Sequence, residues 1–172
     1  MLPDNIKTIE CLIDPDFPRG SFGIYFKHTD GKGIKILLAT RRTTSQFFLN
    51  DILSITSEFY EQRKAYNCLG SKVPEPFEIV VVKSGSIYHL GFSMEHIDGI
   101  RLNMSDMLSS KKIEIEREVK AKTAALGLDK WDYGSNNIII KPNGDWVAID
   151  WAPAFPLTLA QFEERYEVSI AA

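Results

Sequence analysis

The chain has 172 residues, of which 44% are hydrophobic, and its 20 Lys and Arg against 23 Asp and Glu give a formal net charge of -3. This length and apolar content supply a core for one domain or two small lobes and exclude an intrinsically disordered protein. The slightly acidic balance offers no dense positive surface, so we expect no nucleic-acid partner.

The cysteines and the apolar runs indicate where in or outside the cell the protein is expected to work. Cys11 and Cys68 do not have the spacing of a zinc site. The apolar runs are far shorter than a membrane-spanning helix needs, and the N-terminal stretch lacks the basic and apolar regions of a signal peptide. We therefore expect a soluble protein without a membrane span, either cytoplasmic or secreted, since some bacterial export signals are not hydrophobic.

The first half of the chain predicts strands around one long helix. Apolar residues typical of strands occupy 9–13, 23–26 and 34–39. The pair Asp30-Gly31 indicates a hairpin turn before the third strand. Large apolar residues then recur at helical spacing over about 45–68, up to Gly70. Two more strands are predicted over 77–82 and 86–94.

The second half is mainly helical and contains one further hairpin. A break at 95–99 precedes a helix over 112–126, a polar loop over 132–137, a hairpin over 138–150 and a closing helix over 159–168. We predict a single α+β domain with two lobes. Residues 1–94 form an antiparallel five-stranded lobe with one long helix, 95–99 form a hinge, and 100–172 form a strongly reduced helical lobe.

Three polar residues flank the second predicted hairpin. Asp132 and Asn137 precede it, and Asp150 is its last residue. Strand pairing brings the two ends of a hairpin together, so these side chains should surround one small space. Carboxylate and amide oxygens suit Mg²⁺, which fills its remaining positions with phosphate oxygens and water. The same residues would also form an Asx-rich turn without any ligand.

The order of these parts resembles the protein-kinase-like superfamily. The run Gly20, Ser21, Phe22 and Gly23 is similar to the latter part of a glycine-rich loop, whose amides would cover ATP phosphates. Ala39-Thr40-Arg41 is similar to the Ala-x-Lys of the third strand. The resemblance therefore implies that Ala39 lies against the adenine and that Arg41 binds the phosphates, with Lys35 as the alternative cation.

The resemblance extends through the long helix and the hinge. Glu61 resembles the glutamate that pairs with the phosphate-binding cation, and Glu58 is the alternative. Met94 resembles a gatekeeper residue. The backbone from Glu95 to Ile97 would then hydrogen-bond the edge of the adenine.

The remaining motifs lie around the second hairpin. The resemblance makes Asp132 the catalytic aspartate, although the usual preceding histidine is missing, and makes Asn137 a metal ligand. Asp150-Trp151-Ala152 is similar to Asp-Phe-Gly, so Asp150 would bind Mg²⁺. No Ala-Pro-Glu anchor follows. In this respect the chain resembles minimal kinases among secreted bacterial effectors.

The resemblance implies a minimal protein kinase that uses ATP and Mg²⁺ to phosphorylate a Ser, Thr or Tyr hydroxyl of a protein substrate. A host protein would be its target or its activator. Two alternatives remain open at this point. One is a pseudokinase that binds nucleotide or a partner without turnover, and the other is a small-molecule kinase of the aminoglycoside or choline type.

Overall fold

The computed structural model describes residues 6–13, 23–128, 132–153 and 155–167 of the chain. Its strands are β1 (Lys7–Glu10), β2 (Gly23–Lys27), β3 (Gly33–Leu37), β4 (Pro76–Ser84), β5 (Ile87–Met94), β6 (Ile100–Arg101), β7 (Ile138–Ile140) and β8 (Trp146–Ala148). Its helices are α1 (Leu49–Leu69), α2 (Ser109–Ala125) and α3 (Leu159–Tyr166), with short 3₁₀ turns η1 (Leu38–Thr40), η2 (Gly70–Lys72), η3 (Leu102–Met104) and η4 (Ser135–Asn137). None of these helices, within the described ranges, combines the length and the apolar composition that a membrane crossing needs.

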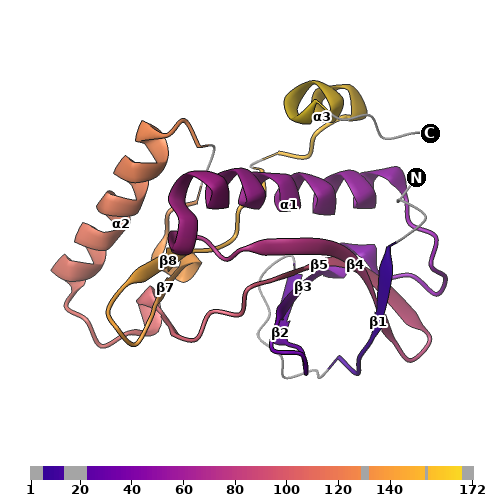
Figure 1. Ribbon diagram of the computed structural model, residues 1–172, viewed down its shortest axis with the longest axis horizontal. Helices are drawn as coiled ribbons and strands as arrows, with labels where there is room; N and C mark the ends of the chain where they lie inside the picture. Colours follow the sequence, from indigo (N-terminus) through magenta and orange to yellow (C-terminus); the bar gives the residue numbers. More distant parts are fainter. Residues whose placement is uncertain (1–5, 14–22, 129–131, 154, 168–172) are drawn as a thin grey trace.

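The first five strands form one sheet in the order β1-β4-β5-β3-β2, which lies against α1 (Figure 1). Strands β2, β3, β5 and β4 pair antiparallel, as predicted. The prediction of a wholly antiparallel sheet is wrong at β1, which runs parallel to β4 with Lys7 opposite Val80. Apolar alternation indicates which side chains of an edge strand are buried, but it does not fix the direction in which that strand runs.

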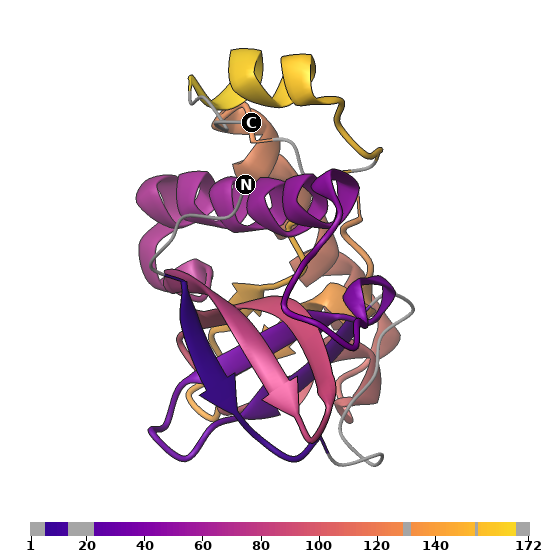
Figure 2. The ribbon, with the colours of Figure 1, turned by 90° about the vertical axis from the view of Figure 1, so that its right-hand side faces the viewer.

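The sheet curls so that its two edge strands cover the same core (Figure 2). Ile9 of β1 shares one buried cluster with Ile24 and Phe26 of β2, although these strands lie at opposite edges of the sheet. The connection between the two edges contains most of the predicted glycine-rich loop. Its residues Gly20, Ser21 and Phe22 lie outside the described residues, and Gly23 begins β2.

The long helix α1 covers the other face of the sheet through apolar side chains at helical spacing. Ile55 and Phe59 are buried against Leu90 and Phe92 of β5. The rings of Phe59 and Phe92 meet edge to face with their centroids 5.9 Å apart. Burying a side chain of this size contributes about 1.5–3 kcal/mol. This contact fixes the rotation of α1 and therefore the direction in which its polar residues point.

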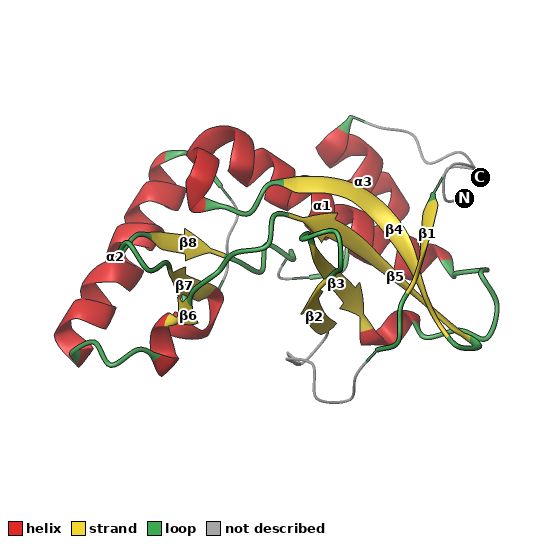
Figure 3. Ribbon diagram, turned by 60° about the horizontal axis from the view of Figure 1, so that its bottom comes forward, coloured by secondary structure: helices red, strands yellow, loops and turns green. Residues whose placement is uncertain are grey.

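A second, smaller sheet of order β6-β7-β8 packs beside α2, away from the first sheet (Figure 3). Its core joins Ile138 and Trp146 to Val119 of α2. Ala65, near the far end of α1, is buried in the same core. The predicted α+β architecture, with a five-stranded sheet, one long helix and a second part of few helices, is confirmed. The helix α1 contributes to the cores of both parts.

The closing helix α3 packs on α1 opposite the sheet (Figure 1). Thr158 caps its start, where the side-chain oxygen accepts a hydrogen bond from the backbone N–H of Gln161. Phe162 is buried, and the ring of Tyr166 stacks on that of Tyr60 with centroids 5.2 Å apart. The sheet and α3 therefore hold α1 from two sides.

Candidate active site

Lys35 links three separate parts of the chain through one ammonium group. It lies on β3, and its Nζ pairs with the carboxylate of Glu58 on α1. The same Nζ lies 2.9 Å from Oδ1 of Asp150, which follows β8. The side chains are 2% exposed at Glu58, 18% at Lys35 and 44% at Asp150. The cluster thus runs from a buried anchor to a group that solvent and ligands can reach.

The two carboxylates decide the protonation of Lys35. Burial acts to lower its pKa, but the attraction of Glu58 and Asp150 and their hydrogen bonds outweigh that effect, and the pKa of Lys35 is raised. The ammonium is therefore charged throughout the physiological pH range. The buried Glu58 holds the ammonium on one side, and the more exposed Asp150 pairs with it on the other.

The structure does not bring Arg41 to this cluster. Strand β3 ends at Leu37, and the turn η1 follows, so Ala39 and Arg41 leave the strand and are exposed. The cause is Thr40, whose buried hydroxyl donates to the carbonyl of Leu37 at 2.7 Å and accepts from the N–H of Leu90 at 2.8 Å. The expected strand alternation through Ala39 and Arg41 is therefore absent. The alternative cation, Lys35, takes the position that faces α1.

Glu61 also differs from its expected pairing. Its carboxylate accepts hydrogen bonds from Nε of Arg165 and from the hydroxyl of Tyr166, each at 2.8 Å. Three residues along an α-helix leave two side chains about 60° apart around the axis, so Glu58 and Glu61 face different neighbours. The described structure pairs Glu58 with the cation of β3 and Glu61 with α3.

Asp132 and Asn137 meet within the loop that precedes the hairpin. Oδ2 of Asp132 accepts from Nδ2 of Asn137 at 2.7 Å, and Oδ1 accepts from the backbone N–H of Gly134 at 2.9 Å. The carbonyl of Asn137 accepts from the N–H of Ile149 at 2.9 Å, which ties this loop to the residue before Asp150. The antiparallel pairing of β7 with β8 thus gathers both ends of the hairpin.

Asp150 has an unusual backbone conformation. Its φ is +62°, in the left-handed region that non-glycine residues rarely adopt. Trp151 anchors the following segment, because its ring is buried and its Nε1 donates to the carbonyl of Ala148 at 3.1 Å. A residue held in a sparsely populated conformation by a buried neighbour is often found at a functional site. This backbone conformation supports a functional role for Asp150.

The predicted hinge lies at the end of β5. Met94 is buried, and Gln62 of α1 reaches its sulfur at 3.5 Å. The backbone N–H of Glu95 donates to the carbonyl of Glu75 at 2.8 Å, and Ile97 is buried. This segment joins the first sheet to the second part of the chain. Whether its backbone binds adenine stays a prediction.

The sequence contains a second signal, which points to Lys35. In Gly33-Ile34-Lys35, glycine takes the place of the alanine in an Ala-x-Lys motif, and the triplet lies wholly within β3. The substitution by glycine hides the match, and Ala39-Thr40-Arg41 offers a closer match in residue type. Because β3 ends at Leu37, only the first of these triplets lies inside the strand.

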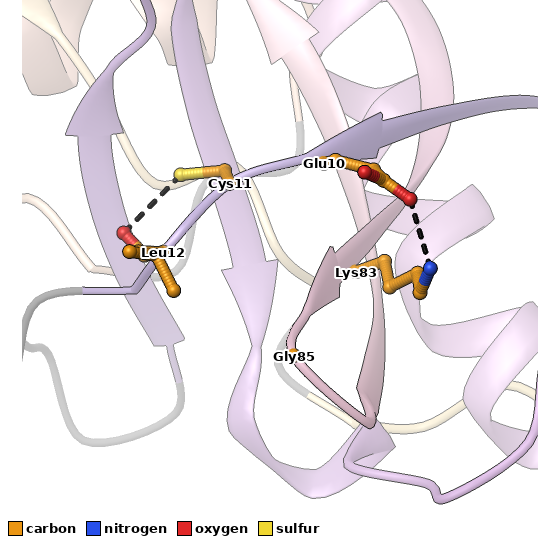
Figure 4. A pocket seen from close by; sticks show the side chains of 5 residues that line it. All are labelled: Glu10, Cys11, Leu12, Lys83 and Gly85. Atoms are coloured by element: carbon orange, nitrogen blue, oxygen red, sulfur yellow. Dashed lines mark hydrogen bonds and ion pairs between the residues drawn. The ribbon is translucent and has the colours of Figure 1, made fainter.

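A pocket at the end of β1 has no residue in common with the Lys35 cluster (Figure 4). Its lining residues are Glu10, Cys11, Leu12, Lys83 and Gly85. Nζ of Lys83 pairs with Glu10 at 2.8 Å across β1 and β4. Glu10 is exposed and Lys83 is partly exposed, and a pair of this kind contributes little to stability.

Comparisons with known proteins complete the description of the site. No protein-family model matches the sequence, and a search of curated proteins finds no match either. Among solved structures, the chain is similar to the Rio2 kinase from Chaetomium thermophilum, in a complex described as ADP/Mg²⁺-phosphoaspartate. The identity is 15% and the TM-score 0.49, and the match covers 94% of this chain and 58% of that one. The chain thus spans little more than half the length of that kinase.

Proposed function

We propose that the protein is a minimal kinase that transfers the γ-phosphoryl group of ATP to a hydroxyl group of a protein. The observation that carries this proposal is the bridge from Lys35 to Glu58 and Asp150. A buried glutamate that holds a lysine beside an exposed aspartate suits the binding of phosphates and their metal ion. The resemblance to secreted bacterial effectors makes a host protein the proposed substrate.

The proposal gives each residue a separate task. Lys35 binds phosphate oxygens, and Glu58 fixes its ammonium in place. Asp150 and the amide oxygen of Asn137 supply hard oxygen ligands for Mg²⁺, which neutralises charge on the phosphates. The hydrogen bond from Nδ2 of Asn137 to Asp132 directs that amide oxygen away from the aspartate. Asp132 orients the acceptor hydroxyl and receives its proton.

A pseudokinase is the second candidate, and the sequence around Asp132 favours it. The resemblance would place a lysine two residues after Asp132, and Gly134 stands there instead. Each carboxylate oxygen of Asp132 accepts one hydrogen bond, from Gly134 and Asn137, and keeps a lone pair for a substrate hydroxyl. The pseudokinase keeps the Lys35 cluster for binding and lacks turnover.

Two measurements test the proposal. Calorimetry with ATP, in the presence and absence of Mg²⁺, should show binding that depends on the metal and is lost in Asp150→Asn, a change that keeps a residue tolerant of positive φ. The matched control is Asp145→Asn, which removes a carboxylate from a lysine pair at the other end of the same hairpin. Equal loss in both variants would argue against a metal site at Asp150.

The second measurement is transfer of labelled γ-phosphate to proteins of a host-cell lysate. Asp132→Asn should bind ATP within a few-fold of the unmodified protein, yet lower transfer by about 10²-fold or more. Metal-dependent binding without any transfer by the unmodified protein would favour the pseudokinase. Absence of nucleotide binding would reject both candidates.

A further inference from the structure

Tyr25 fills the corner between the first sheet and the segment that leaves β5. It lies opposite Lys35 in the pairing of β2 with β3, so both side chains are on the face that α1 covers. From there its ring reaches along β3 to Gly33. It stacks on His96, with centroids 5.9 Å apart and planes within 10°. An aromatic ring of the chain itself therefore occupies the space between Lys35 and the predicted hinge.

Gly33 makes room for that ring. A Cβ at this position would lie 2.3 Å from the hydroxyl oxygen of Tyr25 and 2.7 and 2.8 Å from two of its ring carbons. Gly33 precedes Lys35 by two residues on β3, so both face the same side of the sheet. The strand thus has a glycine where any side chain would displace the ring.

Polar contacts hold the hydroxyl of Tyr25 in this corner. It lies 2.7 Å from Nδ1 of His96, whose Nε2 lies 3.2 Å from Oδ1 of Asp98. In the tautomer of His96 whose Nε2–H faces Asp98, Nδ1 accepts a hydrogen bond from the hydroxyl of Tyr25. Burial raises the pKa of Tyr25 to about 12, against the opposing effect of the backbone N–H of Ile97. The hydroxyl therefore stays protonated at neutral pH.

We infer that Tyr25 is a gate that occupies the position of the nucleotide base, so that adenine enters only after the tyrosine ring has moved away. This inference rests on the proposed function, because it takes Lys35 as the residue that binds the phosphates. A base attached to those phosphates would lie along the same face of β2 and β3. Tyr25 already contacts the N–H of Ile97 there, and the N–H of Glu95 donates to Glu75.

A gate lowers the apparent affinity for ATP by the fraction of molecules in which it is open. A ligand that has phosphates but no base does not meet the gate. Inorganic tripolyphosphate with Mg²⁺ therefore reports on the Lys35 cluster alone, and ATP with Mg²⁺ reports on the cluster and the gate together.

The experiment measures the dissociation constants of both ligands by calorimetry for the full chain and its variants. Tyr25→Ala should lower the dissociation constant of ATP by about tenfold or more and change that of tripolyphosphate less than about twofold, as expected when a mostly closed site is opened. Tyr25→Phe keeps the ring and loses the hydroxyl, so its gain should be smaller. Gly33→Ala forces the ring out without removing it and should also bind ATP more tightly.

Each outcome decides the matter. A gain in ATP affinity in both Tyr25→Ala and Gly33→Ala, with tripolyphosphate unchanged, supports the gate. Weaker ATP binding in Tyr25→Ala would show that the ring is a platform under the base, and would overturn it. No change for ATP, while tripolyphosphate binds, would also overturn it and leave the proposed function standing. If tripolyphosphate does not bind the unmodified protein or any variant, the proposed function fails and the gate falls with it.

Discussion

Two carboxylates on α1, Glu58 and Glu61, are equally buried but belong to different environments. Each side chain is 2% exposed and each pairs with a cation. Glu58 holds Lys35, which also contacts the exposed Asp150. Glu61 holds Arg165 and accepts a further hydrogen bond from Tyr166, both on α3. The Glu58 pair is therefore connected to a solvent-exposed residue, and the Glu61 pair holds α3 against α1.

The comparison teaches that a buried ion pair is not by itself evidence of a site. What distinguishes the Glu58 pair is its third member, an exposed aspartate with a left-handed backbone next to a hairpin end. The Glu61 pair lies between two helices whose aromatic rings also pack together. We therefore expect changes at the first pair to alter ligand binding and stability, and changes at the second to alter stability alone.

The largest effect is expected for Lys35→Met. This change leaves the carboxylate of Glu58 buried without its cation, and breaking a buried pair in this way costs about 3–5 kcal/mol. Urea unfolding measures the loss. The double variant Lys35→Met with Glu58→Leu removes both charges and should recover most of the stability, but not the binding of tripolyphosphate. A double variant as unstable as the single one would contradict this account.

A smaller loss is expected for Arg165→Ala. Glu61 keeps the hydrogen bond from Tyr166, and Arg165 is partly exposed, so we expect a destabilisation of about 1–2 kcal/mol. The binding of Mg²⁺ and tripolyphosphate should stay unchanged. A clear fall in that binding would break the comparison, because it would show that α3 positions Glu58 through α1. Tyr166→Phe, alone and combined with Arg165→Ala, separates the two hydrogen bonds.

The backbone of Asp150 offers a third test, at the open end of the first pair. Because its φ is +62°, Asp150→Gly should be more stable than Asp150→Ala by about 1 kcal/mol, although both lose the carboxylate. The control is Asp145, whose φ is negative and where glycine should be no better than alanine. Thermal unfolding of the four variants measures both differences. The same order at both positions would exclude backbone strain at Asp150.

The smallest effect is expected for Arg41→Ala. Arg41 is exposed beyond the end of β3, so its removal should change stability by less than about 0.5 kcal/mol. The affinity for Mg²⁺ and ATP should also stay near that of the unmodified protein. Calorimetry beside the Lys35 variant tests which residue binds the phosphates. A larger loss of affinity in Arg41→Ala than in Lys35→Met would restore the assignment made from the sequence.

Local pattern predicted much of this molecule, and distant contacts set the rest. The order of the elements follows from apolar spacing and turn residues, and the pairing of β7 with β8 brings Asn137 to Ile149, the residue before Asp150. The choice of cation depends on where β3 ends, which Thr40 fixes through Leu90, 50 residues further along the chain. A hydrogen bond between residues so far apart cannot be predicted from the local sequence pattern.

The choice of glutamate has a similar cause. Glu58 and Glu61 differ only by a small rotation around α1, and the side of the helix that each occupies depends on how α1 docks. Arg165, which donates a hydrogen bond to Glu61, lies 104 residues further along the chain. The parallel direction of β1 likewise depends on β4, which follows it by more than sixty residues.

The position of α1 in two cores has a consequence for how the protein unfolds. Its first turns bury Ile55 and Phe59 against the five-stranded sheet, and its later turns bury Ala65 among the residues of the smaller sheet and α2. If the elements around either core separated from α1, the side chains of α1 that belong to the other core would lose part of their support. Neither part can then melt as an independent unit, and the chain should unfold in one cooperative transition in spite of its two sheets.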